Sequence, residues 1–137
     1  MTIRLFAMLL LASLLQAQSR KHYLVKTLTS QIEVIAEGRG PLLVLLPSLG
    51  RDSEEFDPVA AQLAKGGFRV LRPQPRGYGR STGPLSNINL HDLAKDLAAV
   101  LRKENRGPAI LAGHAFGHFV AKMTAVDFPE LTRGVIL

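Results

Sequence analysis

The alternation of short apolar runs with segments of helical periodicity restricts the fold of this 137-residue chain more than any other feature. Residues 42–47, LLVLLP, form a continuous apolar run, which is typical of a strand buried on both faces of a parallel sheet. Comparable runs, two of them joined by a polar hairpin turn, predict further strands at 22–28, 31–38, 68–74, 108–113 and 134–137.

Three intervening segments place their apolar residues on one helical face. In the first, Asp57 is expected to be the N-cap and Pro58 the first helical residue. Gly66 and Gly67 are expected to end this helix in the left-handed conformation. The other two helices are expected at 90–101, behind a cap at Asn87 or Asn89, and at 117–127.

Strands that alternate with helices predict right-handed crossovers and the α/β class, with a mostly parallel, doubly wound sheet. Residues 20–137 contain no repeat, low-complexity tract or linker, so we expect one domain. The chain ends within the apolar run at 134–137. The sheet is therefore expected to be truncated after its sixth strand.

Residues 1–19, MTIRLFAMLLLASLLQAQS, have the order of features that is typical of a secretory signal. Arg4 precedes an apolar run from Leu5 to Leu15, and the small residues Ala17 and Ser19 follow. The run is too short to span a bilayer as a helix. We expect an exported, periplasmic or secreted protein without a stable membrane span. An uncleaved anchor or an over-long gene start is the alternative, and a protein without a working signal would be cytoplasmic.

Composition and charge limit the kinds of partner, metal and cofactor that the protein is expected to bind. The net charge is +6, but the basic residues are scattered and form no recognisable nucleic-acid motif, so a solvated basic surface is the preferred interpretation. The absence of cysteine excludes disulfides, thiolate nucleophiles and Cys-ligated metals. No set of His, Asp and Glu has metal-ligand spacing, and no cofactor is expected.

The stretch LAGHAFGHF, residues 111–119, has the spacing of the turn G-x-S-x-G, with alanine at the central position. It follows a predicted apolar strand and precedes a predicted helix. Gly113 and Gly117 would let the tight turn approach its neighbours, and the central Ala115 would lie at the start of the helix, where backbone N–H groups favour negative charge.

From about residue 22 to residue 137 the chain resembles the first half of an α/β-hydrolase. Three motifs in the family's order support the resemblance: residues 45–71, which begin LLPSLG; residues 73–84, PQPRGYGRSTGP; and residues 111–137, which contain the elbow. The resemblance implies that Ala115 occupies the nucleophile position and is not competent for attack. It also implies oxyanion donors at the backbone N–H groups of Phe116 and Leu49.

The family's His-Gly pair in the first motif is Pro47-Ser48 in this chain. The family's triad acid and histidine lie beyond the sixth strand, outside this sequence. Ser48, His114 and His118 are expected to line the pocket. Ser48 and Ser81 are alternative nucleophiles, although a loop residue and a turn-supporting serine are the preferred interpretations.

Four further residues have a weaker case for function. Arg76 and Arg80 are candidates for binding an anionic substrate, with a solvent-facing position preferred for both. His22 and His91 belong to no motif.

Three functions remain open at this point. The first is a hydrolase-like protein that acts on a small ester-type or related hydrophobic substrate without an elbow nucleophile. The second is an inactive pseudo-hydrolase that binds a small ligand or a protein partner. The third, an ordinary hydrolase with a deliberate serine substitution, is disfavoured because Pro47-Ser48 also departs from the family. The substrate and the oligomeric state are not determined by the sequence.

Overall fold

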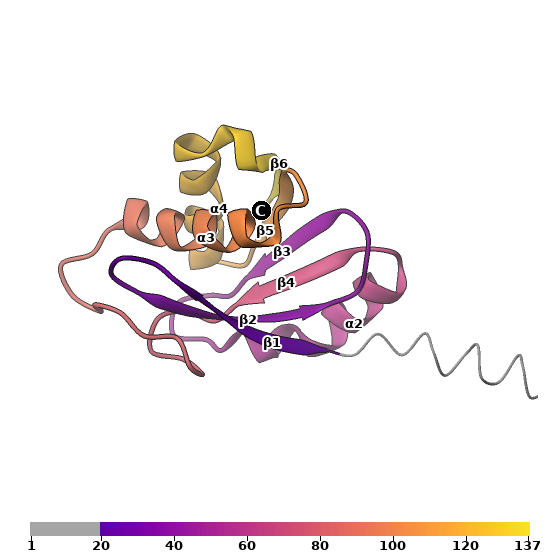
Figure 1. The fold of residues 1–137 in the computed structure, drawn as a ribbon, viewed down its shortest axis with the longest axis horizontal. Coiled ribbons are helices and arrows are strands. Elements are labelled where there is room, and N and C mark those ends of the chain that lie inside the picture. The colour runs from indigo at the N-terminus through magenta and orange to yellow at the C-terminus, as the bar shows by residue number, and fades with distance from the viewer. Residues whose placement is uncertain (1–19) are drawn as a thin grey trace, which may run out of the picture.

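A six-stranded sheet forms the centre of the protein in the computed structural model, which describes residues 20–137 (Figure 1). The strand order is β1-β2-β4-β3-β5-β6. β3 pairs in parallel with β4 and β5, and β5 with β6, whereas β2 pairs antiparallel with β1 and β4. The predicted α/β class with a mostly parallel sheet is confirmed. The predicted signal at 1–19 lies outside the described residues.

The strands are β1 (Lys21–Lys26), β2 (Gln31–Glu37), β3 (Leu42–Leu46), β4 (Arg69–Pro73), β5 (Ala109–Gly113) and β6 (Thr132–Ile136). The helices are α2 (Asp57–Lys65), α3 (Leu90–Glu104) and α4 (Phe116–Asp127), with 3₁₀ turns η1 (Ser53–Phe56) and η2 (Pro129–Leu131).

Helices cover both faces of the sheet (Figure 1). Side chains alternate between the faces along β3: Val44 packs toward α3 and α4, whereas Leu43 and Leu45 pack toward α2. The continuous apolar run in β3 is therefore explained by burial on both sides.

The start of α2 differs from the prediction. Phe56 is its N-cap residue, and Asp57 lies inside the first turn. Asp52 caps the preceding turn η1, where its side chain accepts a hydrogen bond from the Glu54 N–H. The carboxylate of Asp57 instead pairs with Arg72 and Arg20, and these charge-assisted hydrogen bonds displace its predicted capping role.

At two other helix ends the structure decides between neighbouring candidate residues. Asn89 caps α3 through a reciprocal capping box with Asp92, whereas Asn87 takes a positive φ of 55° in the preceding loop. At the end of α2, Gly67 adopts the left-handed conformation and Gly66 does not.

Glu104, the last residue of α3, joins three parts of the fold. Its side chain is 5% exposed and accepts hydrogen bonds from Tyr23 of β1, at 2.6 Å, and from Arg69 of β4, at 3.0 and 3.2 Å. Burial acts to raise the pKa of Glu104, but the hydrogen bonds from Arg69 and Tyr23 outweigh it, so the pKa is lowered. The pKa of Tyr23 is raised by the burial of its own hydroxyl, and then by its hydrogen bond to Glu104 and the charge of that residue.

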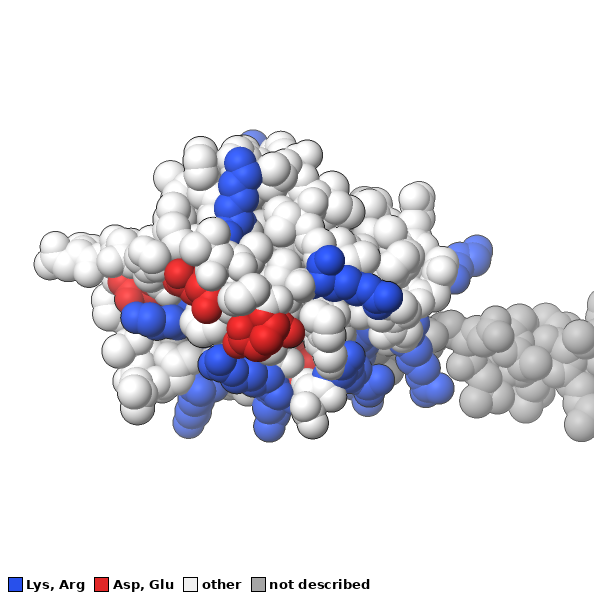
Figure 2. Space-filling model, turned by 90° about the horizontal axis from the view of Figure 1, so that it is seen from above, with Lys and Arg blue, Asp and Glu red and all other residues white. Residues whose placement is uncertain are grey.

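Surface charge forms no dominant patch on the face shown in Figure 2, where lysine and arginine side chains are spread out and acidic side chains lie among them. Within residues 20–137, no helix is long and apolar enough to cross a membrane.

We predict that Glu104→Gln lowers the free energy of unfolding by about 2 kcal/mol at pH 7, because it removes charge-assisted hydrogen bonds from a buried site. Urea denaturation measures the change. The matched control is Glu130→Gln, whose carboxylate is 60% exposed and 3.6 Å from Arg102. Its loss should cost less than about 0.5 kcal/mol.

The same pair of variants tests the pH dependence. A lowered folded-state pKa stabilises the fold above the ordinary value of 4.5, and this contribution is lost as the pH falls below that value. Stability between about pH 5 and pH 3 should therefore fall less steeply in Glu104→Gln than in the wild type. Equal slopes would contradict the assignment.

Candidate functional site

A strained turn connects β5 to α4. Its central residue, Ala115, has φ 49° and ψ −115°, a conformation that residues with a Cβ rarely adopt. Such a backbone costs about 1–3 kcal/mol and persists only when the surrounding structure imposes it. The turn therefore has the strained geometry of a strand–turn–helix elbow even though its central side chain is a methyl group.

Two glycines allow this turn to pack against the sheet. A Cβ on Gly117 would lie 2.3 Å from the carbonyl oxygen of Leu46, at the end of β3. A Cβ on Gly113 would lie 2.4 Å from the backbone of Gly117. Neither position has room for a side chain, because the obstructing atoms belong to the backbone.

Backbone hydrogen bonds fix the elbow. The His114 N–H donates to the Leu46 oxygen at 3.0 Å, and the Gly117 N–H donates to the His114 oxygen at 2.9 Å. Phe116, the first residue of α4, lies between these bonded groups. Its N–H belongs to the helix end at which backbone donors lack intrahelical acceptors.

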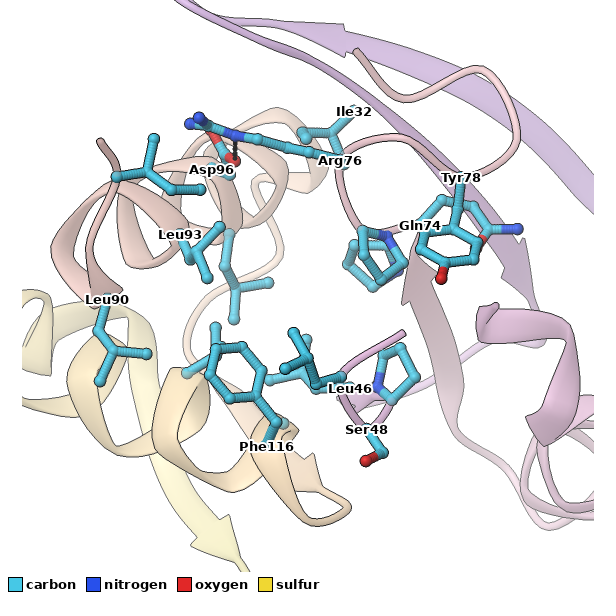
Figure 3. A pocket seen from close by; sticks show the side chains of 18 of the residues that line it. Ile32, Leu46, Ser48, Gln74, Arg76, Tyr78, Leu90, Leu93, Asp96 and Phe116 are labelled. Carbon is cyan, nitrogen blue, oxygen red and sulfur yellow. Dashed lines mark hydrogen bonds and ion pairs between the residues drawn. The ribbon is translucent and has the colours of Figure 1, made fainter. Parts of the chain in front are cut away.

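A cavity of about 480 Å³ lies beside the elbow, at the carboxyl ends of β3 and β4 (Figure 3). Its walls come from the loop after β3, the loop after β4, helix α3 and the start of α4, and most of them are apolar. The residues that define these walls include Leu46, Leu49, Leu85, Leu93, Phe116 and Val120. A site of this size and polarity suits a small hydrophobic molecule.

The two residues predicted to supply oxyanion donors belong to the cavity wall. Phe116 and Leu49 both line it, although the side chain of Leu49 is exposed. Ser48 also lines the cavity, and in Figure 3 its hydroxyl points away from the centre of the enclosed space. The Ser48 carbonyl accepts a hydrogen bond from the Arg51 N–H at 3.2 Å, which shapes this loop.

His114 and His118 do not line the cavity, contrary to the expectation for these two residues. The side chain of His114 is 69% exposed, and its Nδ1 lies 4.0 Å from the Glu55 carboxylate. His118 stacks on Phe119 with ring centroids 4.1 Å apart. His114 lies in the turn before α4, whereas His118 lies in the first turn of α4, on a side of the helix that does not line the cavity.

Ser81 is buried and held on both sides. It accepts a hydrogen bond from the Glu33 N–H and donates one to the Gln74 oxygen, each at 2.9 Å. This is the turn-supporting role that was preferred over nucleophilic catalysis.

The two remaining histidines each lie beside a carboxylate. His22 lies 3.0 Å from Glu33, and His91 lies 2.7 Å from Asp127. Neither histidine lines the cavity.

The two candidate arginines differ. Arg80 is exposed, as preferred, and contacts Glu33. Arg76 was expected to face solvent, and this expectation is wrong: its side chain is 4% exposed and bonds to Asp96 of α3. The hydrogen bonds to Asp96 outweigh burial and raise the pKa of Arg76.

Asp96 was missed from the sequence as a residue of the site. It lies between Leu93 and Leu97 on the apolar stripe of α3, and an acid in that position is a signal that could have indicated a buried partner. Gln74 and Tyr78, in the loop after β4, also line the cavity and were not singled out. In the part of the chain that the structure describes, no group of three or more His, Asp or Glu residues is placed to hold a metal ion.

The chain is similar to known proteins in both sequence and structure. The model of a family described as the alpha/beta hydrolase fold matches residues 41–137. A 2-(acetamidomethylene)succinate hydrolase of Mesorhizobium japonicum is 31% identical over 105 residues, which are 77% of this chain and 37% of that protein. Bifunctional epoxide hydrolase 2 of Sus scrofa is 29% identical over 107 residues, 77% of this chain and 19% of the relative. The chain thus spans well under half the length of these relatives.

Solved structures show the same fold. The crystal structure of an E-2-(acetamidomethylene)succinate hydrolase superposes with a TM-score of 0.78 at 29% identity, over 85% of this chain and 43% of the other. An epoxide hydrolase from Vigna radiata gives a TM-score of 0.78 at 23% identity, over 85% and 37% of the two chains.

We predict that Ala115→Gly stabilises the protein by about 1 kcal/mol, because glycine adopts a positive φ without the steric cost that alanine has there. The same substitution at Ala125, within α4, should destabilise by about 1 kcal/mol. Thermal or urea unfolding of the two variants measures this opposite sign. Destabilisation by both would contradict a strained elbow.

Gly117→Ala should destabilise the protein by at least about 3 kcal/mol or prevent folding, since the new Cβ would overlap the Leu46 carbonyl oxygen. Gly134→Ala in β6 is the control, because a Cβ there meets no atom within 4 Å. Chemical denaturation of both proteins checks the difference, and a Gly117→Ala variant as stable as the control would refute the close packing.

Proposed function

Because the chain belongs to the α/β hydrolase family, we propose that it forms a hydrolase-type site for a small hydrophobic substrate of the ester type, with Ala115 in the position of the elbow nucleophile. The observation that supports this proposal most strongly is the positive φ of Ala115 beside an apolar cavity. The strained turn would direct the Phe116 N–H toward the carbonyl oxygen of a bound substrate.

The site's own groups would act on a carbonyl in two ways. The N–H groups of Phe116 and Leu49 would donate to the carbonyl oxygen and stabilise the negative charge that develops on it during attack. The apolar walls would exclude water from the remainder of the molecule and strengthen these hydrogen bonds.

A covalent intermediate at position 115 is excluded by chemistry, since a methyl group has no lone pair with which to attack. Hydrolysis at this site would need direct attack by water. Within residues 20–137, no histidine lines the cavity, and the Asp96 carboxylate is already bonded to Arg76 and Ser30. The described residues would therefore supply binding and oxyanion stabilisation, and hydrolysis would also require a general base that does not line the cavity in this part of the chain.

The second candidate is a pseudo-hydrolase that binds a small hydrophobic ligand without turnover. Two departures from the family favour it: Ala115 at the elbow, and Pro47-Ser48 in place of His-Gly beside the cavity. Both proposals use the same cavity and donors, and they differ in whether a base and an acid complete the site. The relatives hydrolyse an acetamidomethylene succinate or an epoxide by their names, so they do not select one substrate for this chain.

Restoring the nucleophile separates the two candidates. In the protein prepared from its native host, we predict that Ala115→Ser hydrolyses p-nitrophenyl butyrate at least about 100-fold faster than the wild type, because the new hydroxyl would lie at the strained elbow beside the proposed oxyanion donors. Ala125→Ser on α4 is the control and should show no gain. A folded Ala115→Ser protein as inactive as this control would favour the binding module.

A further inference from the structure

Charged side chains line the cavity at one place. Among the described residues that line it, Arg76 and Asp96 are the two with charged side chains. Figure 3 shows this pair on the opposite side of the cavity from Phe116 and Ser48. A substrate whose carbonyl oxygen binds at Phe116 would therefore direct its other end toward the pair.

The two charges are engaged with each other. Arg76 Nε donates to Asp96 Oδ2 at 2.7 Å, and Arg76 Nη2 donates to Oδ1 at 3.1 Å, a bidentate arrangement. The Arg76 and Asp96 side chains are 4% and 10% exposed.

Neighbouring groups complete the hydrogen bonding of both residues. Arg76 Nη1 donates to the Pro84 oxygen at 3.1 Å, and the Ser30 hydroxyl donates to Asp96 Oδ1 at 2.6 Å. Among residues 20–137, the buried side-chain nitrogen or oxygen that lacks a hydrogen-bond partner is Arg72 Nε. Each nitrogen of Arg76 and each carboxylate oxygen of Asp96 thus has a hydrogen-bond partner within the protein, and the two charges compensate each other.

From this arrangement we propose that the Arg76–Asp96 pair makes the distal end of the cavity select uncharged groups. The proposal rests on the proposed function, because it assumes that a carbonyl binds at Phe116 and places the tail at the pair. A carboxylate at the tail would lose its hydration in an apolar site and meet the Asp96 charge as well as Arg76. An ammonium at the tail would likewise lose its hydration and would meet the Arg76 charge as well as Asp96. Neither the carboxylate nor the ammonium would therefore find a free opposite charge at this end of the cavity.

Three esters that share one head and differ at the far end test this inference. They are dimethyl adipate, which is neutral, monomethyl adipate, which has a distal carboxylate, and methyl 6-aminohexanoate, which has a distal ammonium. Their dissociation constants at pH 7 are measured by NMR titration with the wild type, Asp96→Asn, Arg76→Met and the double variant Arg76→Met/Asp96→Leu. Circular dichroism checks that each variant is folded.

The wild type should bind the neutral ester at least tenfold more tightly than either charged ester. Asp96→Asn leaves the Arg76 charge uncompensated and should improve relative binding of the carboxylate by at least tenfold. Arg76→Met leaves Asp96 uncompensated and should do the same for the ammonium. The double variant, which is neutral again, should retain the wild-type preference. The opposite responses of the single variants are not expected from a general loss of structure, and if one single variant does not fold the other still decides.

Two results would overturn the inference. One is equal binding of all three esters by the wild type, and the other is unchanged selectivity in a folded single variant. Either result leaves the proposed function standing, because the neutral ester still binds. If no ester binds the wild type at all, the proposed function fails and the inference fails with it.

Discussion

The close contact between the elbow and the end of β3 is the constraint on which the site depends. Leu46 accepts the His114 N–H, and the same carbonyl leaves no space for a Cβ on Gly117. With both flanks of the turn held against the sheet, Ala115 is forced to a positive φ. The position of the Phe116 N–H, the direction of α4 and one wall of the cavity all follow from this packing.

Buried ion pairs hold α3 against the rest of the fold at two places. Arg76 and Asp96 connect the loop after β4 to α3 at one end of the cavity, whereas Glu104 ties the end of α3 to Arg69 at the start of β4, at the opposite edge of the sheet from the elbow. Each pair satisfies the hydrogen-bonding groups of residues that would otherwise be costly to bury. The apolar cavity is therefore enclosed by elements that charged side chains hold in place, while its walls stay mostly hydrocarbon.

Local patterns predict the class of the fold, because burial on two faces produces the apolar run in β3 and helical periodicity marks α3. They leave the cap of α3 open between Asn87 and Asn89, and the structure decides for Asn89. Long-range pairing was not predictable in the same way. The local pattern indicates a helix cap at Asp57, because nothing nearby in sequence shows that Arg72, on the following strand, binds its carboxylate. It favours a solvent-facing Arg76 for the same reason, since the partner of Arg76 lies twenty residues away. His114 and His118 show a third limit: the spacing predicts the elbow but not which of its flanking side chains face the cavity.

The central claim is that the elbow still offers an oxyanion site although its nucleophile position is alanine. The most direct measurement is the backbone amide spectrum of Phe116 and Leu49 during titration with ethyl butyrate, compared with ethyl butyl ether, which lacks the carbonyl. We predict that both amide protons shift downfield with the ester and stay nearly unchanged with the ether, because the carbonyl oxygen accepts their hydrogen bonds. Equal shifts with both molecules, or none with the ester while the cavity side chains respond, would contradict the account.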